Sequence, residues 1–190
     1  MAATYRINEI FYSLQGEGFH TGRPAVFLRL SGCNRSCPFC DTDHSSGSIM
    51  TATDIAAQIA AFPSRFVVVT GGEPLLQLDR ELIDALKNLG AEIAVETNGS
   101  LPVPPGVDWV TCSPKDTPWA IDRVDELKIV FDGRDVEAIA AAFPSARHLY
   151  LQPLHDAATA TANTEATVDY IKAHPRWRLS LQTHRLINIP

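Results

Sequence analysis

Residues 33–44 read CNRSCPFCDTDH, and they follow shortly after the apolar run of residues 25–30 (AVFLRL). Three cysteines with the spacing CxxxCxxC fall within this stretch, and His44 closes it. A short apolar run that ends at glycine and polar residues is typical of a buried strand. The stretch therefore indicates metal-binding side chains at the end of a predicted strand, and this arrangement guides the interpretation of the remaining sequence.

Apolar runs of the same kind recur along the chain and alternate with helical patterns. The further predicted strands are residues 66–70 (FVVVT), 92–96 (EIAVE), 109–113 (WVTCS), 126–131 (ELKIVF) and 148–152 (HLYLQ), with 178–182 (RLSLQ) as a candidate seventh. They are rich in β-branched and apolar residues and are bounded by turn residues, which favours strands over helices.

Helical patterns lie between several of these runs. Residues 51–62 (TATDIAAQIAAF) open with threonines that can cap a helix and place apolar side chains on one face. In residues 78–90 (LDRELIDALKNLG), Asp79 is the predicted N-cap and Gly90 the predicted stop. Two more helices are predicted at residues 135–143 (DVEAIAAAF) and 163–174 (NTEATVDYIKAH).

Strands that alternate with helices predict a largely parallel sheet with right-handed crossovers. Six or seven strands in 190 residues favour a partial, split (β/α) barrel, because the closed eight-stranded form typically needs about 250 residues. A doubly wound open sheet is the alternative. We expect one α/β domain over residues 1–190.

Polar motifs follow the predicted strands at the point where each strand ends. After the cysteine stretch come GGEP at 71–74, TNGS at 97–100, SPK at 113–115 and QP at 152–153. The carboxyl ends of parallel strands meet at one rim, where ligands bind. Each motif alone reads as an ordinary turn, but together they predict one shared pocket.

Composition excludes several classes of function. The formal net charge is −6, which disfavours a nucleic-acid partner. No apolar run reaches the roughly 20 residues that cross a bilayer, and the first ten residues lack the pattern of a secretory leader, so we expect a cytoplasmic protein. Three clustered cysteines, with Cys112 far away, favour a metal site over a disulfide framework.

The cysteine stretch supports two different metal sites. Cys33, Cys37, Cys40 and His44 could form a closed Cys3His zinc site. Alternatively, three thiolates could hold an iron-sulfur cube and leave one iron open. That iron can bind the amine and carboxylate of S-adenosylmethionine and pass one electron into its sulfonium. The open site is favoured because Phe39 could pack on an adenine and Glu73 could accept from an ammonium group, whereas zinc leaves the other motifs unexplained.

The motifs resemble a known family. CNRSCPFC and GGEP resemble the radical S-adenosylmethionine (SAM) superfamily. NEIFYSLQGEGFHTGRPAVFLRLSGCN, CDT, TGGEP, ETNGS, SPK, ELK, LQP and RLSLQTHRLINIP resemble the 7-carboxy-7-deazaguanine synthase family, in order from Asn8 to Pro190. Arg185 departs from the lysine that the family often has there, so charge is kept but its geometry could differ.

The resemblance implies a reduced, split radical SAM barrel of the (β/α)6 type. It implies a lyase that contracts the ring of 6-carboxy-5,6,7,8-tetrahydropterin to 7-carboxy-7-deazaguanine with loss of ammonia, on the pathway to queuosine. It further implies one 4Fe-4S cluster per chain, SAM used catalytically, Mg²⁺, a flavodoxin-like or ferredoxin-like reductant and a homodimer.

The resemblance also assigns roles to residues of this sequence. Residues 31–50 would form the cluster-binding loop, and the tail 183–190 would close the substrate site. Cys33, Cys37 and Cys40 would hold the cluster, and Thr42 would bind Mg²⁺. His184 is a candidate for proton handling in the substrate pocket, with a structural histidine beside the chain end as the alternative. The SAM site would comprise Phe39, Cys40, Asp41, Glu73, Gly99, Ser113, Pro114, Lys115, Gln152, Pro153, Leu154 and His155. The substrate site would comprise Leu14, Gln15, Gly16, Arg29, Thr97 and Pro190.

Arg29 is informative without the resemblance, because it interrupts an apolar run where a buried strand favours Val or Leu. A guanidinium inside a barrel needs an anion, and a substrate carboxylate is a natural partner. Two other functions share part of the sequence pattern: an activase that installs a glycyl radical on a protein, and a zinc-stapled binding module. The first needs a protein-binding groove, and the second predicts bound zinc without an iron-sulfur cluster.

Overall fold

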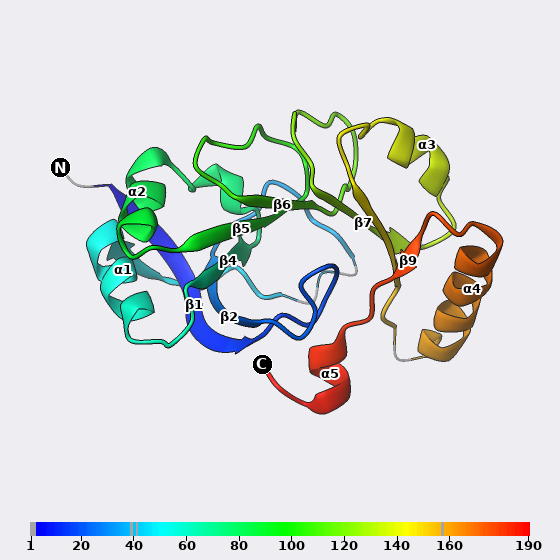
Figure 1. Ribbon diagram of the computed structural model, residues 1–190, viewed down its shortest axis with the longest axis horizontal. Coiled ribbons are helices and arrows are strands. Elements are labelled where there is room, and N and C mark those ends of the chain that lie inside the picture. Colours follow the sequence, from blue (N-terminus) through cyan, green and yellow to red (C-terminus); the bar gives the residue numbers. More distant parts are fainter. Residues whose placement is uncertain (1–2, 39, 41, 157) are drawn as a thin grey trace.

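The structure is a computed structural model that describes residues 3–38, 40, 42–156 and 158–190 (Figure 1). A nine-stranded sheet runs through it in the order β3-β1-β2-β4-β5-β6-β7-β8-β9. The strands are β1 (Thr4–Leu14), β2 (Pro24–Leu30), β3 (Ser48–Thr51), β4 (Phe66–Gly71), β5 (Glu92–Thr97), β6 (Trp109–Cys112), β7 (Glu126–Phe131), β8 (His148–Pro153) and β9 (Arg178–Leu179).

The sheet is mainly parallel. Every pairing from β2 to β9 is parallel, whereas β1 pairs antiparallel with both β2 and β3. The sheet curves without closing, and α1 to α4 lie along its outer side, whereas α5 lies apart from them, beside the C-terminus (Figure 1). The prediction of a partial, split barrel is therefore confirmed, and the doubly wound alternative is wrong.

Five α-helices and a 3-10 turn complete the described chain. They are α1 (Ala52–Ala60), η1 (Pro74–Leu76), α2 (Arg80–Asn88), α3 (Val136–Ala141), α4 (Ala160–Ala173) and α5 (Thr183–Ile187). Thr51 and Asp54 form a capping box at the start of α1, and Asp79 caps α2 as predicted. Gly90 follows α2 with φ of 73°, a left-handed conformation that favours glycine at a helix end.

One local prediction needs correction, and two elements were not predicted. The cluster loop was expected over residues 31–50, but Ser48–Thr51 form strand β3, which pairs with β1. The strand β1 was not predicted: it contains no continuous apolar run, and the alternation of exposed and buried residues at its start is the signal that could have found it. The tail 183–190 was assigned no secondary structure from the sequence and contains α5.

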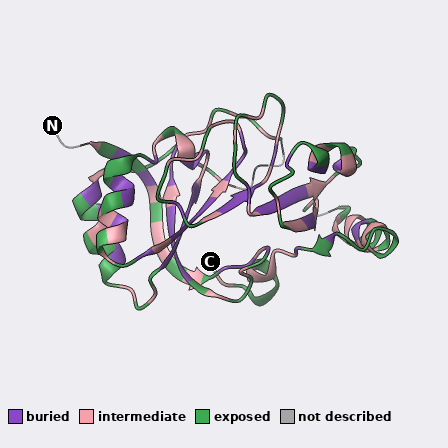
Figure 2. Cartoon of the chain, turned by 45° about the horizontal axis from the view of Figure 1, so that its top comes forward, coloured by how far each residue is buried: buried purple, intermediate pink, exposed green. Residues whose placement is uncertain are grey.

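The hydrophobic core lies between the sheet and its helices, where Figure 2 shows buried residues along the strands and on the inward faces of α1 and α2. Ile55 and Ile59 of α1 and Leu82 and Leu86 of α2 are fully buried there. Such burial is worth roughly 2 to 3 kcal/mol for each side chain, so it holds the strands that position the rim. A second core, around Trp177, supports β7 and β8.

Candidate active site

A cavity of about 730 Å³ lies at the carboxyl ends of the parallel strands. It is lined by residues that follow β2, β4, β5, β6 and β8, which are the positions of the polar motifs in the sequence. The predicted convergence of these motifs on one pocket is therefore observed. The volume lies within the range of small-molecule sites, which is roughly 300 to 1,000 Å³.

Most of the predicted site residues line this cavity. Those described there are Leu14, Gln15, Gly16, Arg29, Cys33, Cys37, Cys40, Thr42, Thr97, Ser113, Lys115, Gln152, Pro153, Leu154, His155, His184 and Pro190. Three others are not among the lining residues: Glu73, Gly99 and Pro114. The predicted SAM contacts Phe39 and Asp41 lie outside the described residues.

The three cysteines of the predicted cluster site are free thiols at the edge of the cavity. Burial raises the pKa of the Cys33 thiol, although the backbone N–H of Arg35 lies 3.4 Å from its sulfur and acts in the opposite direction. Among the described residues, no three His, Cys, Asp or Glu side chains are gathered closely enough to hold a metal ion.

His44, the proposed fourth ligand of a zinc site, also lines the cavity. Its backbone carbonyl accepts a hydrogen bond of 3.0 Å from the N–H of Gly32. This contact ties the far end of the cysteine loop back to the end of β2. His44 thus has a structural contact that requires no metal.

Glu73 of the GGEP motif is fully buried beside the cavity. Its carboxylate accepts hydrogen bonds from the N–H of Leu75 at 3.0 Å, the hydroxyl of Thr97 at 2.8 Å and the N–H of Asn98 at 2.8 Å. Burial nevertheless raises the pKa of this carboxyl. In this arrangement Glu73 joins the loop after β4 to the loop after β5, so its described contacts are structural.

Two glycines allow the GGEP loop to pass against the end of β2. A Cβ atom on Gly71 would lie 2.0 Å from the carbonyl oxygen of Leu30, and one on Gly72 would lie 2.1 Å from that of Gly32. The N–H groups of Gly72 and Glu73 donate to these same carbonyls at 3.1 and 2.9 Å. The cysteine loop and the GGEP loop are therefore joined backbone to backbone.

The SPK motif brings a lysine into the cavity. The ammonium of Lys115 donates to the hydroxyl of Ser113 at 2.9 Å. Burial lowers the pKa of Lys115. Cys112, which precedes the motif, is fully buried, and burial raises its pKa to about 12. Cys112 is therefore an inert core residue.

The guanidinium of Arg29 forms an ion pair with Glu9. Its Nε lies 2.7 Å from a carboxylate oxygen of Glu9, and the two residues face each other across the β1–β2 pairing. The terminal nitrogen Nη1 is 3.5 Å from the hydroxyl of Thr42. Arg29 also lines the cavity, so the guanidinium can contact a ligand while Glu9 holds its Nε.

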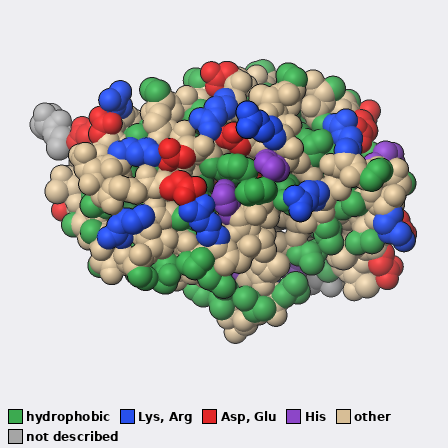
Figure 3. Space-filling view, in the orientation of Figure 1, with side chains coloured by type: hydrophobic (Ala, Val, Ile, Leu, Met, Phe, Trp, Pro, Cys, Tyr) green, Lys and Arg blue, Asp and Glu red, His purple; other side chains and the backbone are tan. Residues whose placement is uncertain are grey.

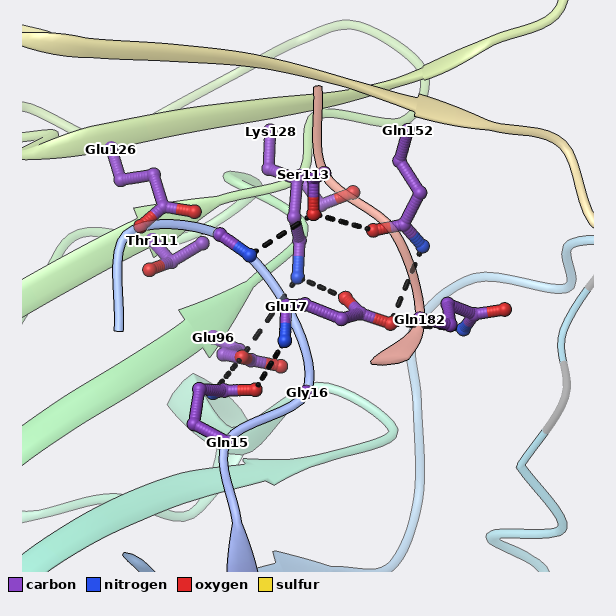
Figure 4. Close-up of polar contacts among 12 residues, drawn as sticks. Gln15, Gly16, Glu17, Glu96, Thr111, Ser113, Glu126, Lys128, Gln152 and Gln182 are labelled. Atoms are coloured by element: carbon purple, nitrogen blue, oxygen red, sulfur yellow. Dashed lines mark hydrogen bonds and ion pairs between the residues drawn. The ribbon is translucent and has the colours of Figure 1, made fainter. Parts of the chain in front are cut away.

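A buried ionic network inside the barrel was missed by the sequence interpretation (Figure 4). Lys128 of β7 pairs with Glu17 and lies 3.9 Å from a carboxylate oxygen of Glu96. Gln15 donates to Glu96 at 2.9 Å. A signal was present, because Lys128 interrupts the apolar run ELKIVF just as Arg29 interrupts AVFLRL.

Glu126 completes this network at its most buried point, with 2% of the residue exposed. The N–H of Phe19 donates to its carboxylate at 3.1 Å. Burial raises the pKa of Glu126 to about 7, although Lys128 acts in the opposite direction. This carboxyl is therefore about half protonated near neutral pH.

The C-terminal segment lies against the loop that follows β1. Thr183 donates through both its N–H and its hydroxyl to the carbonyl of Gly16, at 3.0 and 2.8 Å. The imidazole of His184 lies so close to Gly16 that a Cβ atom there would be 2.1 Å from its Nδ1. The carbonyl of Pro190 accepts from the hydroxyl of Ser13 at 2.7 Å.

Comparisons with known proteins agree with this arrangement. Residues 28–128 match the family model described as the radical SAM superfamily. A 7-carboxy-7-deazaguanine synthase from Bacteroides thetaiotaomicron is 52% identical over 185 residues, which cover 97% of this chain and 98% of the relative. A second, from Bordetella pertussis, is 44% identical over 209 residues, with 98% of this chain and 99% of the relative covered.

A solved structure shares the fold as well. The crystal structure of QueE from Escherichia coli superposes with a TM-score of 0.78 at 30% sequence identity, over 94% of this chain and 93% of that one. The similarity thus extends over nearly the whole chain in both sequence and fold. The chain belongs to the radical SAM superfamily and, within it, to the 7-carboxy-7-deazaguanine synthase family.

Proposed function

We propose that this chain converts 6-carboxy-5,6,7,8-tetrahydropterin to 7-carboxy-7-deazaguanine and ammonia, on the pathway to queuosine. The observation that carries the proposal is the single cavity that joins the cysteine loop, the strand-end motifs and the C-terminal segment. The names of the matched relatives specify the product. Family membership removes the basis for the two alternatives, a glycyl-radical activase and a zinc-binding module.

Enzymes of this superfamily use a 4Fe-4S cluster and SAM. The donor set fits a three-thiolate cluster, because Cys33, Cys37 and Cys40 are free thiols on one loop beside the cavity. When bound, the cluster and SAM supply a radical that abstracts hydrogen from a substrate. The proposed SAM contacts from the other loops include Ser113, Lys115 and Gln152.

The remaining lining residues have proposed roles toward the pterin. Arg29 supplies a guanidinium for the substrate carboxylate, and Gln15 and Thr97 supply hydrogen bonds to its ring. His184 lines the cavity beside Gly16, where an imidazole nitrogen can hold or pass a proton. All four residues line the same cavity, which supports this assignment.

Thr42 is the proposed protein ligand of Mg²⁺. A hydroxyl is a hard oxygen donor, and Mg²⁺ commonly keeps water and substrate oxygens as its other ligands. The position of Thr42 at the cavity, near Arg29, supports the proposal. Replacing Thr42 with Val should raise the Mg²⁺ concentration needed for half-maximal turnover, and an unchanged Mg²⁺ dependence would refute this role.

The decisive test is anaerobic turnover of the reconstituted enzyme with the carboxytetrahydropterin, SAM, Mg²⁺ and a flavodoxin or ferredoxin as reductant. We expect 7-carboxy-7-deazaguanine and ammonia in equal amounts, with SAM regenerated. A tetrahydropterin that lacks the 6-carboxyl group is the matched control and should give no deazapurine. Accumulation of 5′-deoxyadenosine without the product would contradict the proposal.

Two further proposals concern the state of the enzyme. We infer a homodimer from the family resemblance, and sedimentation of the reconstituted enzyme should give twice the mass of one chain. We also infer a cytoplasmic location, which fractionation of the source cells would test. Across the described residues, the helices are all too short or too polar to cross a bilayer.

A further inference from the structure

Within the segment 180–190, which contributes residues to the cavity, residues 185–188 are exposed to solvent. The helix α5 contains no buried residue, and the side chains Leu186 and Ile187 are 72% and 59% exposed. Hydrophobic side chains gather over α5 on the surface in Figure 3. Since so short a helix with no packed apolar face gains little from burial, polar contacts must determine its position.

Ser180 bonds to β8, through its N–H to the carbonyl of Leu151 at 2.9 Å and through its hydroxyl to Gln152 at 3.3 Å, and several further polar contacts of the segment go to one short stretch, residues 13–18. Thr183 binds the carbonyl of Gly16 through two hydrogen bonds, and Pro190 accepts from Ser13. The hydroxyl of Ser180 accepts from the N–H of Gly18 at 3.0 Å. The stretch 13–18 is therefore the platform on which the C-terminal segment lies.

Glu17 connects this platform to both the barrel and the C-terminal segment (Figure 4). One oxygen of its carboxylate accepts from Gln182 at 2.9 Å and from Gln152 at 3.3 Å. The other oxygen pairs with the ammonium of Lys128. One carboxylate thus joins β7, β8 and the residue directly before α5.

The burial of the pair makes this junction strong. The Lys128 and Glu17 side chains are 7% and 15% exposed. Burial acts to raise the pKa of Glu17, but Lys128 and the hydrogen bond from Gln182 lower it overall. A charged carboxylate in such surroundings binds N–H donors more strongly and more directionally than an exposed one.

We propose that Glu17, held by Lys128, is the latch that positions residues 182–190, and with them His184 and Pro190, at the cavity. Glu17 is a positioning residue in this role, because its described contacts are with the protein. The proposal rests on the proposed function for its kinetic readout. Its structural readout, the mobility of the segment, is independent of any substrate.

The test replaces Glu17 with Gln in the reconstituted holoenzyme. The amide keeps the size of the carboxylate but removes its charge and turns an NH2 group toward the donors Lys128 or Gln182. Hydrogen exchange of peptides from residues 180–190, measured anaerobically without substrate, should accelerate about tenfold, as expected for loss of one charge-assisted hydrogen bond.

Glu92→Gln is the matched control. It also removes the carboxylate of an ion pair, the one between Glu92 and Arg23. Glu92 lies at the start of β5, at the opposite end of the strand from the cavity. This variant should leave the exchange of residues 180–190 as it is in the unmodified protein.

A second variant removes the hydrogen-bond donor to Glu17 instead of Glu17 itself. Gln182→Ala leaves the Lys128–Glu17 pair in place and removes the hydrogen bond from the segment. It should accelerate the same peptides, and combining it with Glu17→Gln should add little, because both changes break one junction. If Glu17→Gln does not fold, the exchange measured in Gln182→Ala alone tests whether the Glu17–Gln182 contact positions residues 182–190.

In turnover assays Glu17→Gln should raise KM for the pterin about tenfold and lower kcat less, with an unchanged cluster absorbance. A raised KM with unchanged exchange would overturn the latch, because Glu17 would then act on the substrate directly. If the unmodified protein does not make the deazapurine, the proposed function is refuted. Faster exchange in Glu17→Gln would still support the role of Glu17 as the latch.

Discussion

Two basic residues interrupt otherwise apolar strands, Arg29 in β2 and Lys128 in β7. Each is retained there because a carboxylate lies beside it, Glu9 in the first case and Glu17 in the second. The surroundings differ, however. Glu9 is half exposed, so water screens that pair, whereas the Lys128 pair is almost fully buried.

Arg29→Ala should weaken substrate binding without affecting cluster assembly. Loss of a guanidinium that pairs with a substrate carboxylate is expected to cost roughly 2 to 3 kcal/mol, which corresponds to a rise in KM of about 30-fold to 150-fold. Steady-state kinetics and the iron content check this outcome. Arg29→Lys should recover part of the loss, because it keeps the charge without the planar fork.

If Arg29→Ala instead loses the iron-sulfur cluster, the residue is structural. In that case the contact of Arg29 with Thr42 would be its main contribution, since Thr42 lies on the cysteine loop.

The buried carboxyl of Glu126 should make the free energy of unfolding depend on pH. Its pKa is raised from 4.5 to about 7 by burial, so the folded protein holds this proton more tightly than the unfolded chain. The contribution to stability is complete below pH 4.5 and is lost as the pH rises through 7, on the order of 3 kcal/mol in total.

Glu126→Gln removes this titration and keeps an acceptor for the N–H of Phe19. Urea unfolding at pH 5 and at pH 8 should show the variant gaining stability relative to the unmodified protein as the pH rises. A stability difference that is the same at both pH values would show that Glu126 does not titrate in this range.

At the scale of elements, the sequence predicted those parts that carry a strong periodic signal. The six apolar runs are strands, and Asp79 and Gly90 bound α2 as expected. The strand β1 contains no continuous apolar run, because only one of its faces enters the core; the alternation of polar residues with Tyr5 and Ile7 is the period-two signal that could have identified it. The helix α5 was missed because it buries nothing, so no periodicity marks it.

The residues of the candidate site could likewise be predicted only in part. Loops that end predicted strands could be assigned to one rim, because topology alone brings strand ends together. The carboxylates Glu17, Glu96 and Glu126 could not be grouped around Lys128 without the register of the sheet and the path of residues 15–23. Their grouping depends on long-range packing that no local pattern encodes.

The junction between β2 and the GGEP loop yields a prediction at this scale. Gly71→Ala places a methyl group 2.0 Å from the Leu30 carbonyl at a φ of 143°. It should destabilise the protein by roughly 2 kcal/mol or more, the sum of backbone strain and a displaced hydrogen bond. It should also lower the iron content after reconstitution, because the cysteine loop begins at this junction.

Gly133→Ala is the control for that change. Gly133 also has a positive φ, 91°, but nothing lies within 4 Å of an added Cβ atom. It should therefore show only the strain of a left-handed residue, about 1 kcal/mol, with the iron content unchanged. Equal losses in both variants would show that the close approach to Leu30 is unimportant. Chemical unfolding and iron analysis provide the measurements.

For the whole molecule, the cavity joins nearly every strand end, so a ligand bound there should stabilise the entire fold. SAM at about 100 times its Kd should add roughly 2.7 kcal/mol to the stability of the reconstituted enzyme. The thermal midpoint should therefore rise with SAM concentration. Cys33→Ser, which removes a proposed cluster ligand, should show a much smaller rise, and an equal rise would place SAM away from the cysteine loop.

The anchored ends of the cysteine loop have a consequence for chain length. Gly32 is fixed by the carbonyl of His44 and by the GGEP loop, and Ser48 begins β3, which pairs with β1. Lengthening a loop whose ends are already held costs only about 0.6 kcal/mol for each doubling of its length. Extra residues inserted between such fixed ends would leave the sheet in register, so this loop can be lengthened while the strands that carry it stay the same.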